Sequence, residues 1–208
     1  MKSCARLAPG CPAARSDEVT NLSLPAPRDL IAEINACTAC GLHATRLQPV
    51  IGSGDGHSGL LIVGEAPGAK EDETGMPFVG RSGTLLRRMV EQELAMASET
   101  LTITNVVRCR PPKNRTPTRK EQATCYPFME RQLRFLNPKV ILTVGNTAAR
   151  MLLQTKEGIT TLRGKSYLRG GAVIVPTFHP AAALRGRPDI EAAMRHDIRL
   201  AGSFLRSS

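Results

Sequence analysis

Short apolar runs typical of buried strands alternate along this chain with segments whose apolar residues recur at helical spacing. Strands that alternate with helices imply a mostly parallel sheet covered by helices on both faces, so we expect an α/β fold. The expected strands are residues 60–63, 101–107, 140–144, 165–168 and 172–176. The expected helices are residues 28–36, one capped by Ser82, one from the capping box at 118–121 to about 135, residues 147–154 and residues 188–205.

The length and composition allow one domain. The chain has 208 residues, 41% of them hydrophobic, which is enough for one well-buried core and short for two. Residues 1–27 are rich in Pro and Ala and contain Cys4 and Cys11. Such a segment buries too little to offset its ordering entropy, so we expect a disordered leader followed by a folded domain over residues 28–208.

The net charge and the apolar runs restrict the partners. A formal charge of +10 indicates an anionic partner, most simply nucleic acid, although a basic surface without a partner is a fair alternative. No stretch approaches the roughly 20 apolar residues that a bilayer span needs. Residues 1–16 have no continuous apolar stretch that could serve as a secretory signal. We expect an intracellular protein that does not enter a membrane.

Polar residues follow several of the expected strands. A Gly-rich loop at residues 64–83 follows the first strand, Asn105 lies near the end of the second, Asn146 follows the third and His179 follows the last. In an open parallel sheet these carboxyl ends meet at one edge, which is where ligands bind. We expect a site for a small polar ligand at this edge.

The loop of residues 64–83 contains several candidate binding groups. Phe78 offers a flat apolar face that can stack on a base. Glu65, Glu71 and Asp72 are candidates for orienting water or contacting the base, although a solvated loop carboxylate is the commoner case for any one of them.

Asn105 and His179 are the candidate polar groups on the other strands. Asn105 interrupts a β-branched run, and such a misfit is often functional, although Asn more commonly ends a strand. Its amide offers an acceptor beside a donor, which matches N3–H and O4 of uracil and mismatches cytosine. His179 can donate to an oxygen on which negative charge develops, such as uracil O2 when the base leaves, although a lone His is more often structural.

Four cysteines lie in the part of the chain that we expect to fold. Cys37 and Cys40 form a Cys-x-x-Cys pair, and Cys109 and Cys125 are separated by fifteen residues. Four thiolates suit zinc or an iron–sulfur cluster, and the spread second half favours a cluster because zinc ribbons usually supply two close pairs. Buried thiols and a redox-active pair are the alternatives.

Several of these segments together closely resemble family 4 uracil-DNA glycosylases, over residues 31–205. The segments are Gly64-Glu-Ala-Pro-Gly68 with Glu71-Asp72, Gly75-x-Pro-Phe-Val-Gly-Arg-x-Gly83, Thr104-Asn-Val-Val-x-Cys-Arg-Pro-Pro112, Asn114-Arg-x-Pro117 and His179-Pro-x-Ala-x-Leu-Arg185, with the four cysteines. The resemblance implies a three-layer αβα sandwich, a [4Fe-4S] cluster, and hydrolysis of the N-glycosidic bond of uracil in DNA, which leaves an abasic site for base excision repair. It further implies a monomer in the cytoplasm that acts at the nucleoid.

Site roles follow from the same resemblance. The cluster ligands would be Cys37, Cys40, Cys109 and Cys125, and the uracil pocket would be formed by Glu65, Ala66, Phe78, Asn105 and His179. Asn105 would read the base, His179 would stabilise the leaving anion, and Glu71 would either exclude the thymine methyl group or help to place water.

DNA contacts are expected at two places. Leu184 can wedge into the base stack while Arg185 holds a phosphate, although a first helical turn explains these residues equally well. The expected phosphate-binding loop beside the cysteines has the cations Arg108, Arg110, Lys113, Arg115 and Arg119, of which Arg110 and Arg115 are the chosen candidates. A cluster there would organise this loop without redox chemistry.

Two other functions fit part of the sequence. One is a relative that binds uracil in DNA, or becomes attached to it, without turnover; that group carries a Gln in the first loop and a basic insertion, neither of which is evident here. The other is a metal-stabilised nucleic-acid-binding module without catalysis, which would leave Asn105, His179 and Phe78 without a role.

Overall fold

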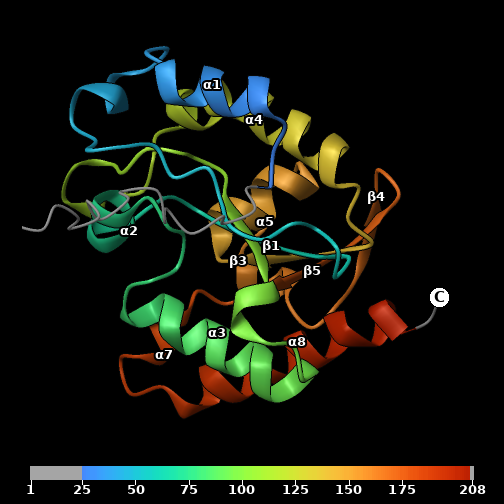
Figure 1. Cartoon of the computed structure of the whole chain (residues 1–208). Coiled ribbons are helices and arrows are strands. Elements are labelled where there is room, and N and C mark those ends of the chain that lie inside the picture. Colours follow the sequence, from blue (N-terminus) through green and yellow to red (C-terminus); the bar gives the residue numbers. More distant parts are fainter. Residues whose placement is uncertain (1–24, 207–208) are drawn as a thin grey trace, which may run out of the picture.

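A computed structural model describes residues 25–206 of the chain. Its centre is a five-stranded sheet with the strand order β2-β1-β3-β5-β4 (Figure 1). The strands are β1 (Leu60–Gly64), β2 (Thr102–Asn105), β3 (Val140–Val144), β4 (Tyr167–Arg169) and β5 (Ala172–Thr177). Neighbouring strands are parallel except β4 and β5, which form an antiparallel pair at one edge. The expected α/β fold with a mostly parallel sheet is confirmed.

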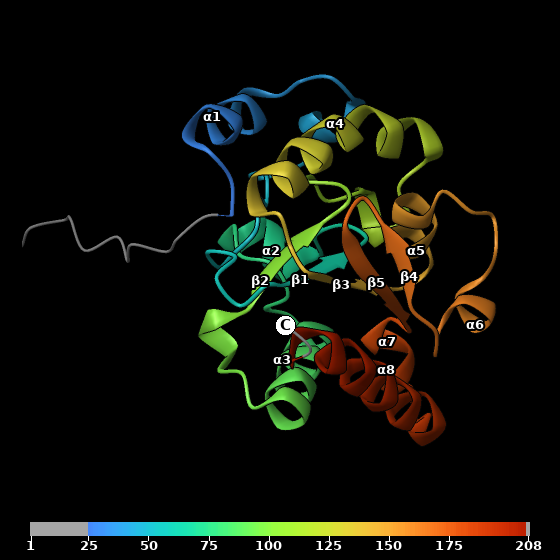
Figure 2. The same ribbon diagram turned by 90° about the vertical axis from the view of Figure 1, so that its right-hand side faces the viewer.

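Helices cover both faces of this sheet and complete a three-layer αβα sandwich (Figure 2). They are α1 (Arg28–Ala36), α2 (Ala69–Thr74), α3 (Arg81–Leu94), α4 (Arg119–Leu136), α5 (Asn146–Leu153), α6 (Ile159–Leu162), α7 (Pro180–Ala183) and α8 (Pro188–Arg206). Successive side chains of a strand point to opposite faces. Leu60 and Ile62 therefore pack in one core with α3 and α8, whereas Leu61 and Val63 pack in the other with α4 and α5.

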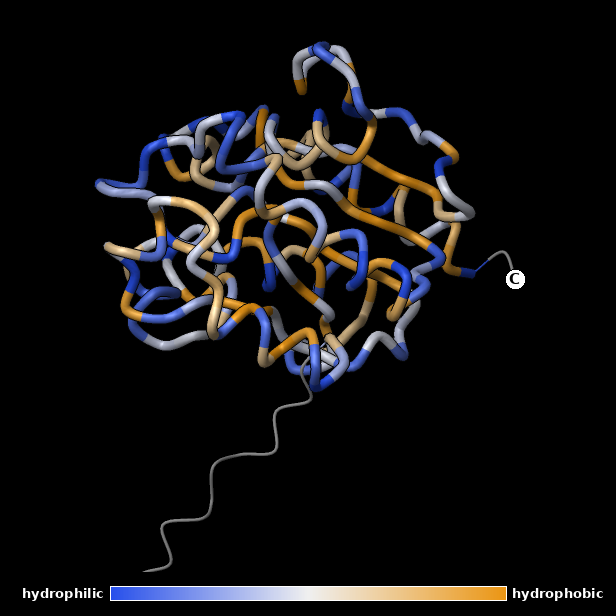
Figure 3. The backbone as a smooth tube through the Cα atoms, turned by 90° about the horizontal axis from the view of Figure 1, so that it is seen from above, coloured by the Kyte–Doolittle hydropathy of each residue, from blue (hydrophilic) through white to orange (hydrophobic). Residues whose placement is uncertain are grey.

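Strands β1, β2 and β3 are buried along their whole length, whereas the edge strand β4 is partly exposed. The side chains of Ile62, Val63 and Val144 are 0% exposed, and Figure 3 shows apolar segments of the chain running through the interior. None of the helices within residues 25–206 is long and apolar enough to cross a bilayer. Because the strands are covered on both faces, polar groups reach the surface mainly where the strands end.

The segment between β1 and α3 differs from the prediction. It contains the short helix α2, and the N-cap of α3 is Gly80 and not Ser82. The cause is the carboxylate of Glu71, which accepts hydrogen bonds from the peptide N–H groups of Val79 and Gly80 at 2.9 and 2.8 Å. Glu71 thus fixes the chain just ahead of the helix, no described side chain caps the N–H groups of the first turn, and Ser82 lies within that turn.

The start of the described chain also differs from the prediction. The expected disordered leader reaches residue 27, but Pro25 and Ala26 are buried. Gln132 of α4 donates a hydrogen bond to the carbonyl of Pro25 at 2.8 Å, and Ala26 packs with Leu30 and Ile34. The folded domain supplies the apolar surface that this segment lacks, which its own composition does not reveal. The rest of the leader, with Cys4 and Cys11, lies outside the described residues.

Candidate active site and metal centre

A cavity of about 650 Å³ opens at the carboxyl edge of the sheet. Its walls come from the segment between β1 and α3, the end of β2, the loop before α4, the start of α5 and the segment after β5. The predicted site residues that line it are Glu65, Ala66, Glu71, Phe78, Asn105, Arg115 and His179. The structure therefore brings together every residue that was expected to form the pocket, although these residues are spread over more than half of the sequence.

The end of β1 is closely packed against two residues that line this cavity. Gly64 pairs with Asn105 in the register of β1 and β2. A Cβ atom on Gly64 would lie 2.4 Å from Oδ1 of Asn105 and 2.5 Å from Cζ of Phe78. Asn105 is only 2% exposed, yet no hydrogen bond joins its side-chain amide to another described residue. The cavity thus contains an amide with free donor and acceptor groups beside an aromatic ring, which suits a planar polar ligand.

Phe78 is held by its backbone. Its φ angle is +55°, a left-handed conformation that is uncommon for a bulky residue. Arg87 of α3 donates hydrogen bonds to the carbonyls of Pro77 and Phe78 at 2.9 and 3.1 Å. A Cβ atom on Gly83 would lie 2.2 Å from the carbonyl carbon of Phe78, so Gly83 makes room for this turn. Backbone strain fixed by surrounding contacts is common at binding sites.

Glu71 organises the loop that carries Phe78. Its carboxylate accepts hydrogen bonds from the N–H groups of Gly68, Val79 and Gly80, at 3.1, 2.9 and 2.8 Å. A carboxylate offers about four acceptor positions, so three are already occupied. Glu71 lines the cavity, but most of its hydrogen-bonding capacity is used to fix the backbone of the loop that carries Phe78.

The other two acidic candidates have different surroundings. Glu65 lines the cavity, and its carboxylate accepts a hydrogen bond from the hydroxyl of Thr147 at 2.5 Å. Asp72 is 1% exposed and is not among the residues that line the cavity. It accepts a hydrogen bond from the N–H of Leu47 at 3.0 Å and lies 4.0 Å from Arg110. The prediction that Asp72 contacts the base or orients water is wrong, because this carboxylate anchors the chain ahead of β1.

His179 follows β5 and is the N-cap of α7. Its Nδ1 atom accepts a hydrogen bond from the N–H of Ala181 at 3.2 Å, so the neutral ring carries its proton on Nε2. Burial lowers the pKa of His179 below its ordinary value of 6.5, and the nearby Glu71 opposes that shift only in part. The site therefore presents a neutral imidazole whose Nε2–H is available as a donor.

A buried ion pair lies behind His179. Asp197 of α8 is 0% exposed and accepts hydrogen bonds from Arg163 at 2.7 and 2.9 Å and from the hydroxyl of Thr177 at 2.9 Å. The Arg163 guanidinium lies 5.5 Å from the ring centre of Phe178, next to His179 in the chain. Sequence reasoning missed these residues, since nothing in the helical pattern of α8 distinguishes Asp197 from a surface carboxylate.

One of the four predicted DNA-contacting residues, Arg115, lines the cavity, and the others lie on segments that contribute to its walls. Leu184, at the end of α7, is 42% exposed, and Arg185 is also exposed. Arg115 lines the cavity and is paired with both carboxylate oxygens of Glu121, at 2.7 and 2.8 Å. This pairing lowers the pKa of Glu121 to about 2. Arg110 is partly buried and donates a hydrogen bond to Asn114 at 2.7 Å.

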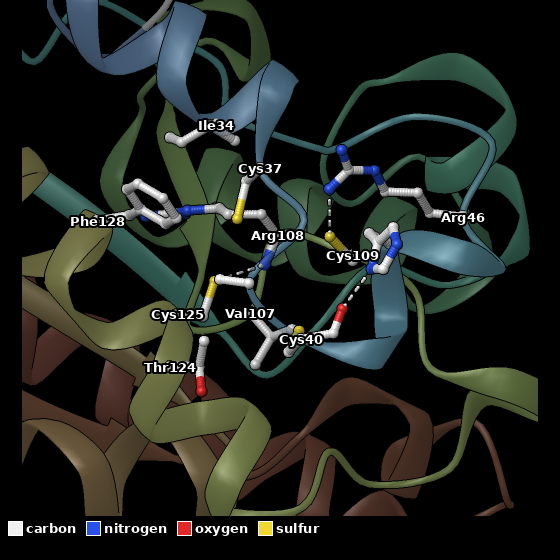
Figure 4. A pocket seen from close by; sticks show the side chains of 12 residues that line it. Ile34, Cys37, Cys40, Arg46, Val107, Arg108, Cys109, Thr124, Cys125 and Phe128 are labelled. Carbon is white, nitrogen blue, oxygen red and sulfur yellow. Dashed lines mark hydrogen bonds between the residues drawn. The ribbon is translucent and has the colours of Figure 1, made fainter.

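The four predicted metal ligands surround one cavity (Figure 4). The volume of this cavity is about 20 Å³. The ligands come from three segments that are far apart in the sequence: Cys37 and Cys40 after α1, Cys109 after β2 and Cys125 within α4. All four are free thiols. Within residues 25–206, no group of three or more His, Cys, Asp or Glu side chains is arranged to hold a single metal ion.

The chemistry of this donor set suits an anionic metal–sulfur group. Arg46 donates a hydrogen bond to Sγ of Cys109 at 2.9 Å, and the peptide N–H of Arg108 donates to Sγ of Cys125 at 3.4 Å. Such donors stabilise thiolate sulfur. Burial raises the pKa of both the Cys109 and the Cys125 thiol, so these residues would release protons on binding a metal.

Arg108 does not belong to a phosphate-binding surface. It is 1% exposed and its side chain points into the protein between β2 and α4, which corrects the prediction that groups it with the surface cations of this loop. Burial lowers the pKa of Arg108 to about 10, an effect that Cys125 and Cys109 oppose. The hydropathy pattern does not reveal the burial of Arg108. An Arg that follows two valines and precedes a cysteine is compatible with a buried or an exposed side chain.

Comparison with known proteins places the chain among glycosylases. The profile of the Uracil DNA glycosylase superfamily matches residues 51–199. A type-4 uracil-DNA glycosylase of Thermotoga maritima is 42% identical over 86% of this chain and 94% of its own length. The type-4 enzyme of Saccharolobus solfataricus is 39% identical, over 86% of this chain and 87% of its own. A type-5 uracil-DNA glycosylase of Mycobacterium leprae is 30% identical over 73% of this chain and 75% of its own.

The state of His179 can be measured directly. We expect NMR of the imidazole nitrogens to show the neutral Nε2–H form at pH 7 and protonation below pH 6.5, because burial lowers the pKa of His179. The unfolded chain then takes up this proton at higher pH than the native one. The stabilising contribution of the neutral ring is therefore complete above pH 6.5 and is lost as the pH falls below it.

The signal is assigned by its loss in His179→Asn. A proton on Nδ1, or a pKa at or above 6.5 for this ring, would contradict the geometry of the site.

Proposed function

This chain belongs to the Uracil DNA glycosylase superfamily, among its type-4 members, and from that premise we propose how its cavity releases uracil from DNA. The activity is hydrolysis of the N-glycosidic bond, which yields free uracil and an abasic site for base excision repair. The observation that carries the proposal is the meeting of Asn105, Phe78 and His179 around one cavity at the carboxyl edge of the sheet.

Asn105 and Phe78 recognise the base. A base in a duplex is out of reach of any side chain, so the uracil nucleotide is first turned out of the helix. Its ring then stacks on Phe78, and the free amide of Asn105 donates to O4 and accepts from N3–H. Cytosine presents the opposite donor and acceptor at these two positions and would leave the buried amide unpaired, which is the basis of discrimination.

His179 acts on the leaving group. As the bond between C1′ and N1 of the nucleotide breaks, the electron pair moves onto the uracil ring and negative charge develops at O2. The Nε2–H of the neutral His179 donates to that oxygen, in a site already oriented by the Ala181 N–H contact at 3.2 Å. Water adds its oxygen to C1′, and its proton ends on the departing base.

Glu71 contributes through the loop. Its three hydrogen bonds to peptide N–H groups hold the Phe78 turn in place. We therefore assign Glu71 the role of a positioning residue, which supports the wall of the pocket near C5 of the base. Glu65, bonded to Thr147, forms the neighbouring wall.

Four residues on segments next to the cavity bind the DNA. Leu184, an exposed apolar side chain, fills the gap left by the extruded nucleotide, and Arg185 follows it as a phosphate ligand. Arg110 and Arg115 flank the cavity from the loop before α4, where the pairing of Arg115 with Glu121 orients its guanidinium. The partner is uracil-containing DNA, bound by a monomer inside the cell.

A [4Fe-4S] cluster is the group that best suits the four cysteines. Cys37, Cys40, Cys109 and Cys125 would hold it, and the cluster would tie the end of α1, the end of β2 and α4 together. Because the chemistry of base release needs no electron transfer, its contribution is structural.

Loss of the Asn105 amide or of the His179 imidazole should strongly reduce the rate of uracil release. Asn105→Ala and His179→Ala are expected to lower the single-turnover rate on a uracil-containing oligonucleotide by about 100-fold or more, as for removal of an oxyanion donor, while DNA affinity stays near that of the unmodified protein. Asn35→Ala, at an exposed position of α1, is the control and should leave the rate unchanged.

The same assay separates the alternatives. Free uracil with repeated turnover supports the glycosylase. An attached product would indicate a relative without turnover, binding without base release would indicate a binding module, and full activity of either variant would remove that residue from the mechanism.

The metal is tested on protein purified without oxygen. We expect iron and sulfide contents that match one [4Fe-4S] cluster per chain, with visible iron–sulfur absorbance that is lost in Cys125→Ser and kept in Cys4→Ser. Removal of the iron should lower both the thermal stability and the affinity for DNA. Unchanged stability and affinity would show that the cluster does not organise this part of the fold.

A further inference from the structure

Arg108 is a buried cation that lies between the cysteine cavity and Asn105. Its side chain is 1% exposed. Among the described residues no carboxylate forms an ion pair with it, and it lines the cysteine cavity. A buried charge without a counter-charge is unfavourable, so its retention here calls for an anion or for a set of specific hydrogen bonds.

The guanidinium forms hydrogen bonds with residues at the end of β2. Its Nη1 group donates to the carbonyl of Asn105 at 2.7 Å and also contacts the hydroxyl of Thr104. Its Nη2 group donates to Oε1 of Gln132 on α4 at 2.6 Å. The backbone of Asn105, from which the uracil-reading amide projects, is therefore fixed by Arg108.

The same residue is connected to the cysteine site. Its peptide N–H donates to Sγ of Cys125 at 3.4 Å, and Cys109 is its neighbour in the chain. Four thiolates that hold a [4Fe-4S] cluster carry net negative charge together with it. Such a cluster would supply the counter-charge that the guanidinium lacks. The buried Nε atom of Arg108 has no hydrogen-bond partner among the described residues.

We propose that Arg108 is a positioning residue that couples the cluster to uracil recognition, because this residue lines the cysteine cavity and its buried guanidinium holds the backbone of Asn105. This inference rests on the proposed glycosylase activity. It gives the cluster a specific effect on the pocket in addition to its effect on the fold.

Arg46 provides a matched control. It also donates a hydrogen bond to a cysteine sulfur, that of Cys109 at 2.9 Å, and its other contact is the carbonyl of Asn35 at 3.1 Å. It has no contact with Asn105 or the end of β2. A substitution of Arg46 therefore perturbs the cysteine site without touching the pocket.

The test compares Arg108→Met, Arg108→Lys and Arg46→Met in full-length, cluster-loaded protein. The measurements are iron retained after a fixed exposure to chelator, and kcat on a uracil-containing oligonucleotide per loaded molecule. Arg108→Met should lose iron faster and lower kcat by about tenfold or more, the size expected for hydrogen bonds to a charged group, with little change in KM. Arg46→Met should lose iron faster while its kcat stays within about twofold.

A double-mutant cycle locates the effect. If Arg108 acts through Asn105, Arg108→Met should change kcat little when Asn105 is already Ala. Arg108→Lys keeps the buried charge but lacks the planar fork, so it should retain iron and still lower kcat. This variant carries the test if Arg108→Met does not fold.

Three results would contradict the proposed function or the proposed role of Arg108. An unmodified protein that releases no uracil would overturn the proposed function. A protein that turns over, but whose Arg108 variants keep full kcat, would overturn this inference alone. Full additivity with Asn105→Ala would also overturn it, since the effect would then be a general one on the fold.

Discussion

The end of β1 has no room for a side chain at Gly64, and the pocket depends on that restriction. The amide of Asn105 and the ring of Phe78 both approach the Gly64 backbone so closely that a methyl group would overlap them. One comes from the neighbouring strand and the other from the loop that follows β1. Only a residue without a Cβ atom allows the Asn105 amide and the Phe78 ring to lie this close together. Together they form a flat polar slot at the sheet edge.

The supports of this slot come from elements far from it. Glu71 closes the Phe78 loop, Arg87 holds its carbonyls, and Arg108 holds the backbone of Asn105. On the opposite wall, Asp197 and Arg163 lie behind the segment that carries His179. Several Arg side chains therefore form hydrogen bonds inside the protein. The formal charge of +10 is for this reason larger than the positive charge available on the surface to bind DNA.

The sequence predicts most of the helices and strands, and it predicts which residues lie at the carboxyl edge of the sheet. Strand runs and the capping box at Thr118 depend on local pattern, and β3 agrees with its predicted range. Asn105 and His179 could be placed because parallel strands end at one edge. Helix α2, the role of Glu71, and the burial of Asp72 and Arg108 depend on partners distant in the chain, and local patterns do not encode such partners. The positions expected to bind uracil line one cavity.

Substitution of Gly64 tests the account most directly. Gly64→Ala would place a methyl group against Asn105 and Phe78, whereas Gly158→Ala adds the same group where nothing lies within 4 Å. The measurement is the single-turnover rate of uracil release, with iron content and DNA affinity followed in parallel. We predict a fall of about 100-fold for Gly64→Ala, the scale of a small misplacement of binding groups, and no change for Gly158→Ala. Uracil release by Gly64→Ala at the unmodified rate would contradict the account.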